Sequence, residues 1–241
     1  MWFFAYDNTY EESAYHIEDP SSSTTLSNST IYEWFHKFRE AASYQINHWN
    51  AQMGLIGGEG IRVQIDETKV GHRKYHTGHL VDGQWVIGFV EEESKRFDCA
   101  LCPGGKRNRA TLEPIIRSKI APGSVIITDY WKGYDWISDP NSGYIHEKVN
   151  HSEGFAEYHE DGHTIHTNTI ESCWRPVKDF FRRRKLREEH FFWALQEYRW
   201  RRMVKKKQMD RFLALADAIK LKFKPELFNY MQSDSSGIDL Q

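Results

Sequence analysis

The sequence has few cysteines and no long apolar run. Its three cysteines, Cys99, Cys102 and Cys173, are an odd number and cannot form an even disulfide framework, which agrees with a reducing compartment. No run of about 18 or more apolar residues occurs, which excludes a membrane-spanning helix, and residues 1–6 lack the charged flank of a signal peptide. We therefore expect a soluble intracellular protein, nuclear if its source is eukaryotic and cytoplasmic otherwise.

Net charge is also nearly absent, at −2, which at first argues against a nucleic-acid partner. The distribution of charge argues the other way. Residues 1–36 contain six acids and no Lys or Arg, whereas residues 171–207 contain thirteen basic residues against five acids. Because phosphate contacts dominate DNA affinity, the second segment is a candidate DNA-binding surface. Its densest run is Arg182, Arg183, Arg184 and Lys185.

Two stretches predict buried strands that end in a carboxylate. From Ile61 to Thr68 apolar and polar residues alternate, so Ile61, Val63 and Ile65 are expected on a buried face, with the polar residues pointing away and Asp66 near the strand's end. Ser124 to Asp129 is a continuous apolar run, typical of a strand buried on both faces.

A third carboxylate follows at the start of a helix. The pattern after His166 predicts a helix with Thr167 or Asn168 as its N-cap, which places Glu171 in the first turn. Further strands are expected at 85–90, 97–101 and 144–149. A crossover helix at 111–120, with Pro114 in its first turn, puts the Asp129 strand in a parallel part of the sheet.

Four motifs occur in a fixed order along the chain: I-D-E-T-x-V-G at 65–71, T-D-Y-W-K-G-Y at 128–134, V-N-H-S at 149–152 and H-T-N-T-I-E-S-x-W at 166–174. Together they resemble the ISXO-type transposases, a family related to the Merlin elements. The resemblance runs from about Gly57 to Arg202. It implies an α/β, ribonuclease-H-like mixed sheet with flanking helices, preceded here by a small helical segment.

The resemblance also implies an Asp-Asp-Glu triad, which maps onto Asp66, Asp129 and Glu171, and a basic position at Lys178. The departures from the family pattern are Lys69, His72 and the lack of a preceding zinc ribbon.

The implied activity is metal-dependent DNA cleavage and strand transfer of a mobile element. Carboxylates suit Mg²⁺, which Mn²⁺ can replace, and two such ions about 4 Å apart can hold the attacking and leaving oxygens. In this hypothesis Asp66 bridges both ions, Asp129 binds one and Glu171 the other, while Lys178 holds a phosphate nearby. The implied partners are element ends and target DNA, bound by a homo-oligomer. The alternatives are a domesticated DNA-binding protein without turnover and a nuclease without strand transfer.

The expected organisation has three parts. Residues 1–54 form a helical segment, either a helix-turn-helix remnant or a cap on the core, whose main helix begins at a capping box, Thr30-x-x-Glu33. Residues 57–205 form the catalytic domain, and 206–241 a last helix and a disordered tail. Basic side chains near the end of the catalytic domain, such as Arg199 and Arg201, are expected outside a layer of packed aromatics.

Other candidate ligands predict no metal site. Cys99 and Cys102 are two ligands where structural zinc needs four, so both are taken as strand residues. Glu91, Glu92 and Glu93 are expected in a solvated turn. The histidines match no closed zinc pattern, although two of them, His151 and His166, lie in the motifs and could orient carboxylates or contact DNA. These histidines are His146, His151, His159, His163 and His166.

Overall fold

The computed structural model describes residues 1–17, 27–71, 83–149, 156–158, 164–184 and 186–224. The chain forms two compact units. One consists of residues 53–191, and the other combines residues 1–52 with 192–241. These units divide the chain differently from the expected ranges 1–54, 57–205 and 206–241, because the helix before residue 206 groups with the N-terminal helices. The expected ranges, as functional domains, stay a prediction.

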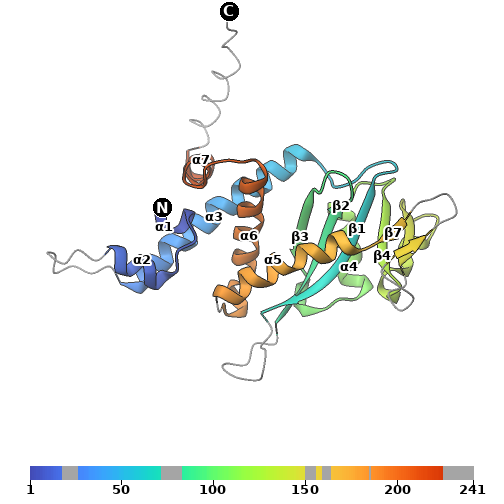
Figure 1. The fold of residues 1–241 in the computed structure, drawn as a ribbon, viewed down its shortest axis with the longest axis horizontal. Helices are drawn as coiled ribbons and strands as arrows, with labels where there is room; N and C mark the ends of the chain where they lie inside the picture. The colour runs from blue at the N-terminus through green and yellow to red at the C-terminus, as the bar shows by residue number, and fades with distance from the viewer. Residues whose placement is uncertain (18–26, 72–82, 150–155, 159–163, 185, 225–241) are drawn as a thin grey trace, which may run out of the picture. The chain divides into compact units, whose positions relative to one another are not determined.

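The unit of residues 53–191 is built on a mixed five-stranded sheet with the order β3-β2-β1-β4-β5 (Figure 1). Its strands are β1 (Arg62–Val70), β2 (Gln84–Glu91), β3 (Phe97–Leu101), β4 (Val125–Asp129) and β5 (Ile145–Val149). The first three strands pair antiparallel, whereas β4 pairs parallel with both β1 and β5. This arrangement confirms the expected ribonuclease-H-like fold and places β4 in its parallel part.

Helices cover both faces of the sheet. Helix α4 (Arg109–Lys119) packs Leu112 and Ile116 against one face, in a core shared with Val63, Ile65 and Phe89. Helix α5 (Asn168–Arg184) lies over β1 and β2 on the other face (Figure 1). The shorter elements of this unit are η1 (Pro103–Gly105), η2 (Lys132–Ser138), β6 (Ala156–Tyr158), β7 (Thr164–His166) and η3 (Glu188–His190).

A glycine allows α5 to approach the sheet closely. A Cβ at Gly88 of β2 would lie 2.5 Å from the Trp174 indole and 3.1 Å from Ile170. Both of these α5 residues are buried, and Trp174 also meets the ring of Phe97 edge-on. Only the missing side chain leaves room for the indole, so Gly88 sets how near α5 lies to β2.

The alternating pattern predicted that the polar residues of β1 face solvent, but Gln64 and Thr68 are buried. Gln64 is fully buried beneath α5, whereas Ile61, expected in the core, is 44% exposed and precedes the strand. The Gln64 amide oxygen accepts the backbone N–H of Ile170 at 3.0 Å, and its nitrogen donates to Glu92 at 2.6 Å. The same nitrogen lies 3.2 Å from His166 Nδ1. This amide therefore supplies a partner to the first turn of α5, where N–H groups lack intrahelical acceptors.

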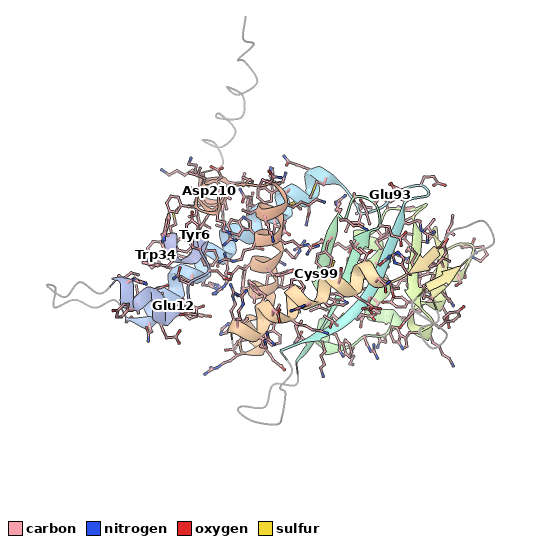
Figure 2. The ribbon with its side chains drawn as sticks, viewed as in Figure 1. Tyr6, Glu12, Trp34, Glu93, Cys99 and Asp210 are labelled. Carbon is pink, nitrogen blue, oxygen red and sulfur yellow. The ribbon has the colours of Figure 1, made fainter. Side chains whose placement is uncertain are left out.

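The acidic turn after β2 is also more structural than expected. Glu91 is buried and accepts hydrogen bonds from the backbone of Gly57 and the hydroxyl of Ser94, and Glu92 pairs with Arg62 at 2.7 Å. Only Glu93 is exposed, as predicted for a solvated turn (Figure 2).

Helix α4 begins two residues earlier than predicted. Asn108 is its N-cap and accepts the backbone N–H of Thr111 at 3.0 Å. Pro114 therefore lies beyond the first turn, where its missing N–H removes one bond of the helix.

The second unit is helical and has its own core. Its helices are α1 (Trp2–Ala5), α2 (Tyr10–Ile17), α3 (Asn28–Met53), α6 (Phe191–Lys206) and α7 (Arg211–Phe223). Phe4, Phe35 and Trp200 lie in this core, and Trp200 donates its indole N–H to Gln45 at 2.7 Å. Two hydrogen bonds tie Asp210 to the start of α7, and it also accepts from Tyr6 (Figure 2).

The helix starts in this unit differ from the predicted capping box. Helix α3 begins before Thr30, whose backbone N–H is bound by the hydroxyl of Ser27 at 3.2 Å. A reciprocal capping box occurs instead at α2, where Thr9 and Glu12 each accept the other's backbone N–H. Whether these helices bind DNA as a helix-turn-helix stays untested. In the described residues no helix has the length and hydropathy needed to cross a membrane.

We predict that Gln64→Met lowers the free energy of unfolding by about 1–3 kcal/mol, because the buried Ile170 N–H loses its acceptor and the Glu92 carboxylate loses one of its donors. Urea unfolding followed by circular dichroism measures this loss. The control is Gln84→Met, at a partly exposed glutamine of β2, which we expect to change stability by less than about 0.5 kcal/mol. Equal losses for the two variants would contradict the structural role of the Gln64 amide.

Candidate active site

Asp66 lies in the middle of β1 and not at its end, because the strand continues to Val70. Its position is nevertheless special, since β1 stops pairing with β4 at Gln64. Asp66 thus faces the edge where the parallel strands separate, although β2 still pairs with it on the other side. Its Oδ2 accepts the indole N–H of Trp174 from α5 at 2.7 Å.

Asp129 is the last residue of β4, as predicted. Gln64 pairs with Ile127 in the parallel register, and Asp66 and Asp129 each follow two residues later. Because side chains alternate with a period of two, both carboxylates lie on the same face of the sheet and at the same edge. The Oδ1 of Asp129 accepts the backbone N–H of Trp131 at 3.0 Å, which fixes the turn after the strand.

Glu171 occupies the first turn of α5, as predicted. Its backbone N–H binds the carbonyl of Thr167, and the Thr167 hydroxyl lies 3.1 Å from Glu171 Oε1, to which it donates. Asn168, the other candidate for the N-cap, is the first residue of the helix and is exposed. Thr167 therefore both precedes the helix and orients the Glu171 carboxylate.

The three carboxylates share one electrostatic environment. Burial raises the pKa of Asp66, and the negative charges of Asp129 and Glu171 raise it further, while the hydrogen bond from Trp174 opposes these effects. A charge shifts the pKa of another group clearly only when the two groups lie close together. The strand register therefore places Asp66 and Asp129 at one edge of the sheet, and the charge of Glu171 acts on Asp66. Their role as one catalytic site stays a prediction.

The donor set suits a hard divalent cation. Three carboxylates supply oxygen ligands of the kind that Mg²⁺ prefers, and their mutual repulsion is what a cation would relieve. Among the described residues, no three His, Cys, Asp or Glu side chains converge closely enough to hold a metal ion as they stand. Each of the three carboxylates is instead oriented by a protein donor, from Trp174, Trp131 and Thr167 respectively. The chemistry of the residues fits the ion, whereas their final approach to it stays a prediction.

The predicted basic residues follow Glu171 along α5. Lys178 is exposed, and seven residues place it two helical turns from Glu171. Arg182 forms an ion pair with Asp179 at 3.0 Å, and Arg184 lies with its guanidinium carbon 3.4 Å from the centroid of the Phe180 ring. Arg183 is exposed, and Lys185 lies outside the described residues.

Glu67 was not predicted as a functional residue, although it follows Asp66 directly. It points to the opposite face of β1, where its Oε1 accepts the hydroxyl of fully buried Tyr134. Burial raises the pKa of Glu67 to about 7, and the charges of Asp66 and Asp129 contribute to the increase. The T-D-Y-W-K-G-Y motif contained the signal, since its last residue is this tyrosine.

Two of the candidate histidines, His146 and His166, contact groups other than the three carboxylates. His166 contacts the amide of Gln64 rather than a carboxylate, and His146 lies between the hydroxyls of Thr128 and Ser138, with burial lowering its pKa to about 4. Cys99 is a buried residue of β3, and Cys102 follows the strand. The remaining histidines, His151, His159 and His163, lie outside the described residues.

An apolar cavity of about 570 Å³ lies in the helical unit and is lined mainly by aromatic and aliphatic side chains. Its lining includes Phe3, Trp34 and Phe38 but no carboxylate. Its lining therefore offers no oxygen ligands of the kind that Asp66, Asp129 and Glu171 supply.

Comparison with known proteins gives one family and one curated relative. The ISXO2-like transposase domain matches residues 56–202. An uncharacterized transposase-like protein of Haemophilus influenzae is 37% identical over 93 residues, which are 38% of this chain and 70% of the relative.

Solved structures show weaker likenesses. The catalytic core domain of BIV integrase is 11% identical with a TM-score of 0.33, over 73% of this chain and 99% of that one. The HTLV-2 integrase catalytic core domain in complex with magnesium is 11% identical with a TM-score of 0.31, over 71% and 90%. A chain of the simian T-cell lymphotropic virus intasome in complex with PP2A regulatory subunit B56 gamma is 11% identical with a TM-score of 0.33; the match covers 70% of this chain but only 50% of that chain's length. At such TM-scores the likenesses carry no functional information.

We predict that Glu67 makes the metal-free protein less stable as pH rises. Its pKa is about 7 in the folded chain against 4.5 ordinarily, so between these values the folded state binds more protons and the free energy of unfolding falls with rising pH. From pH 4.5 to 8, wild type should lose up to about 3 kcal/mol relative to Glu67→Gln. Urea unfolding in EDTA measures the difference.

The matched control for this measurement is Glu93→Gln, at the exposed turn after β2. It should keep the pH dependence of the wild type. Parallel stability curves for wild type and Glu67→Gln would show that Glu67 ionises normally.

Proposed function

Because the chain belongs to the ISXO2-like transposase domain family, we propose that it catalyses metal-dependent cleavage of DNA at the ends of a mobile element and transfer of the cut strand to target DNA. The observation that supports this most is geometric: Asp66 and Asp129 each follow the paired residues Gln64 and Ile127 by two positions, and helix α5, which carries Glu171, is hydrogen-bonded to Asp66 through Trp174 at 2.7 Å. An edge of a sheet that gathers three acids is destabilised by their repulsion. A bound cation relieves that repulsion, which is why we assign a metal to this edge.

In this proposal Asp66, Asp129 and Glu171 hold two Mg²⁺ ions, which Mn²⁺ can replace. Such ions, when bound, stabilise the charge that develops on the attacking and leaving oxygens of an in-line displacement at phosphorus. The protein's own part is to aim the carboxylates. Trp174 holds Asp66, the Trp131 backbone holds Asp129, and Thr167 holds Glu171.

The reaction has two displacements. In the first, a water oxygen forms a bond to phosphorus and the bond to the 3′ oxygen breaks, which leaves a 3′-hydroxyl and a 5′-phosphate. In the second, that 3′ oxygen bonds to a phosphorus of target DNA, and the target's own 3′ oxygen leaves with a proton. Both steps use the same site because both displace an oxygen at phosphorus.

Lys178 is proposed as a phosphate contact close to the reacting strand. It is exposed and lies two turns beyond Glu171, so its flexible stem can carry the ammonium toward the site from the same side of α5. The run Arg182–Arg184 extends the positive surface along the helix. Element ends and target DNA are the proposed partners, bound by a homo-oligomer.

We predict that Glu171→Gln abolishes divalent-dependent cleavage, by at least about a hundredfold, while folding and DNA binding persist. The substitution keeps the shape of the side chain and the hydrogen bond with Thr167 but removes the charge that a second Mg²⁺ requires. The assay uses labelled candidate terminal repeats with and without Mg²⁺ and scores both cleaved and joined products.

Two controls accompany this assay. Glu188→Gln removes the same charge from an exposed acid of η3, and Asn168→Ala alters the first residue of α5; both should cleave at near wild-type rates. A Glu171→Gln protein that cleaves normally would show the triad to be wrongly assigned. Wild type that binds DNA but never cleaves it would instead favour a domesticated DNA-binding protein.

We predict that replacing Arg182, Arg183 and Arg184 by Ala weakens binding to all DNA sequences. The slope of log K against log[salt] should flatten by up to about three, one for each lost phosphate contact. Fluorescence anisotropy of labelled duplexes across a range of KCl concentrations measures it. The matched control replaces Lys220, Lys222 and Lys224 of the α7 region, which removes equal charge outside the basic segment and should leave the slope intact. An unchanged slope for the arginine variant would mean that these residues are solvated surface.

A further inference from the structure

Arg107 lies against two indole rings at the start of α4. Its guanidinium carbon is 4.3 Å from the centroid of the Trp85 ring and 5.2 Å from that of Trp131. Both tryptophans are half-buried against the core under α4, whereas Arg107 is exposed. The rings therefore hold the flat guanidinium in place while leaving its edge accessible to solvent.

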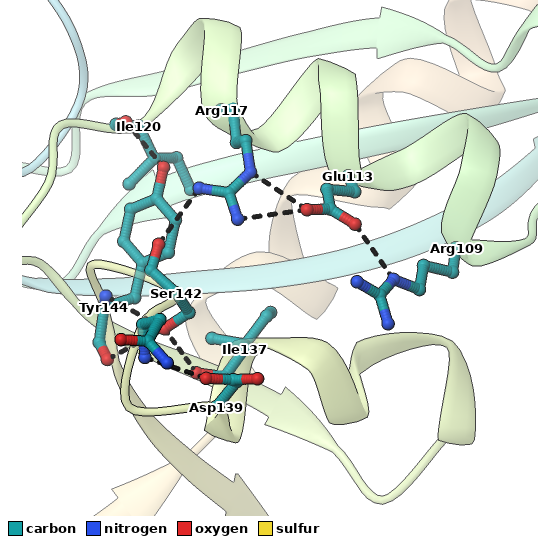
Figure 3. Close-up of polar contacts among 9 residues, drawn as sticks. Arg109, Glu113, Arg117, Ile120, Ile137, Asp139, Ser142 and Tyr144 are labelled. Atoms are coloured by element: carbon teal, nitrogen blue, oxygen red, sulfur yellow. Dashed lines mark hydrogen bonds and ion pairs between the residues drawn. The ribbon is translucent and has the colours of Figure 1, made fainter.

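The donors of Arg107 are not used within the described part of the chain, where its side chain has no hydrogen bond or ion pair. The arginines of α4 differ in this respect (Figure 3). Arg109 donates to Glu113 at 2.9 Å, and Arg117 donates to Glu113 and to the carbonyl of Ser142, each at 3.0 Å. Arg117 also lies over an indole, that of Trp136, at 4.8 Å. The neighbouring arginines stabilise the fold, whereas the five N–H donors of Arg107 are available to a ligand.

The fold places Arg107 at the same edge of the sheet as the carboxylates. β3 runs antiparallel to β2, and β2 antiparallel to β1, so β3 points in the same direction as β1 and β4. Arg107 follows the end of β3 and therefore lies at the edge where β4 ends in Asp129. Although burial dominates and raises the pKa of Glu67, the Arg107 charge acts to lower it, so Arg107 lies within electrostatic range of Glu67, on the face of β1 opposite to Asp66.

Trp131 connects the two groups. Its indole supports Arg107, and its backbone N–H holds the carboxylate of Asp129. One residue thus fixes both an acid of the proposed site and a cation beside it. A shift of the turn after β4 would move both together.

We propose that Arg107 binds a phosphate of the DNA strand that lies in the active site. This phosphate is the neighbour of the one that reacts, and Trp85 and Trp131 hold the guanidinium in the orientation that binds it. This inference rests on the proposed function. A phosphodiester is the ligand that a rigid, planar guanidinium fork fits, because two parallel N–H groups match two phosphate oxygens. DNA approaching three carboxylates is repelled, and a cation at the same edge offsets that repulsion. The indole faces are occupied by the guanidinium, so they support it rather than stack on a base.

The test compares Arg107→Gln and Arg107→Lys with Arg117→Gln in binding to a labelled 30-base-pair duplex of random sequence, titrated with KCl. Arg107→Gln should lower the slope of log K against log[KCl] by about 0.9 and weaken binding about five- to tenfold at 0.1 M salt. Arg107→Lys keeps the charge and should keep the slope. Arg117→Gln removes the same charge and a similar indole contact, but its donors serve the fold, so its slope should equal that of wild type.

A purely structural role for Arg107 is separated by melting temperature. Such a role would lower the melting temperature of Arg107→Gln and leave the salt slope unchanged, which would overturn the inference. If Arg107→Gln does not fold, Arg107→Met keeps the aliphatic stem across the rings and is measured in its place. A loss of affinity for Trp85→Leu without any loss for Arg107→Gln would assign the site to base stacking and would also overturn it.

The outcomes also separate this inference from the proposed function. Wild type that neither binds nor cleaves DNA would overturn both. Wild type that cleaves DNA in Mg²⁺ while Arg107→Gln keeps the wild-type slope would overturn the Arg107 contact alone. A lowered slope for Arg107→Gln, together with normal cleavage by Glu171→Gln, would support the phosphate contact and overturn the catalytic assignment.

Discussion

The position of α5 along β1 determines whether the three acids can form one site. Two hydrogen bonds, one helical turn apart on α5, fix that position. The Ile170 backbone donates to Gln64, and the Trp174 indole donates to Asp66. Gly88 of β2 leaves room for the indole, so the helix can come close enough for both bonds to form. Glu171 lies between the two anchored residues. Its distance from Asp66 is therefore set by packing and by a buried amide, before any ligand is considered.

That arrangement concentrates negative charge, and the surrounding residues reduce the electrostatic repulsion that results. Burial and mutual repulsion raise the pKa of Asp66, while the Trp174 hydrogen bond works in the opposite direction. Glu67 points to the other face of β1, where the Tyr134 hydroxyl binds it and its raised pKa of about 7 keeps a large share of it protonated near pH 7. The protonated form of Glu67 adds no fourth negative charge behind the three acids. The opposite orientations of Asp66 and Glu67 follow from the alternation of a strand, which gives adjacent residues opposite faces.

Local patterns in the sequence located the strands, the crossover helix and the three acids, because periodicity and turn residues act within a few positions. They failed where a distant element decides the environment. Gln64 looks like a solvent-facing residue of an alternating strand, and only α5, about a hundred residues later, makes it a buried anchor. The buried role of Glu91 depends likewise on the Gly57 backbone. Helix starts were misplaced for a different reason: hydroxyl and acidic side chains at capping spacing occur at both Thr9 and Thr30, and the chain uses only the first as a reciprocal box.

The same distinction applies to the basic segment. Counting charge along residues 171–207 treats every cation as available, but some guanidinium groups are consumed by the fold. Arg199, expected on the surface, is buried and donates to Gln196, and Arg201 binds Glu197 at 2.7 Å together with the carbonyls of Phe4 and Ala5. A cation that already satisfies a carboxylate or a carbonyl gains little from a phosphate, since it must give up one partner for another. What distinguishes a ligand-binding arginine is thus the state of its donors rather than its place in a charged run. By that criterion a single residue outside the segment, Arg107, is better suited to hold a phosphate than Arg199 or Arg201 within it.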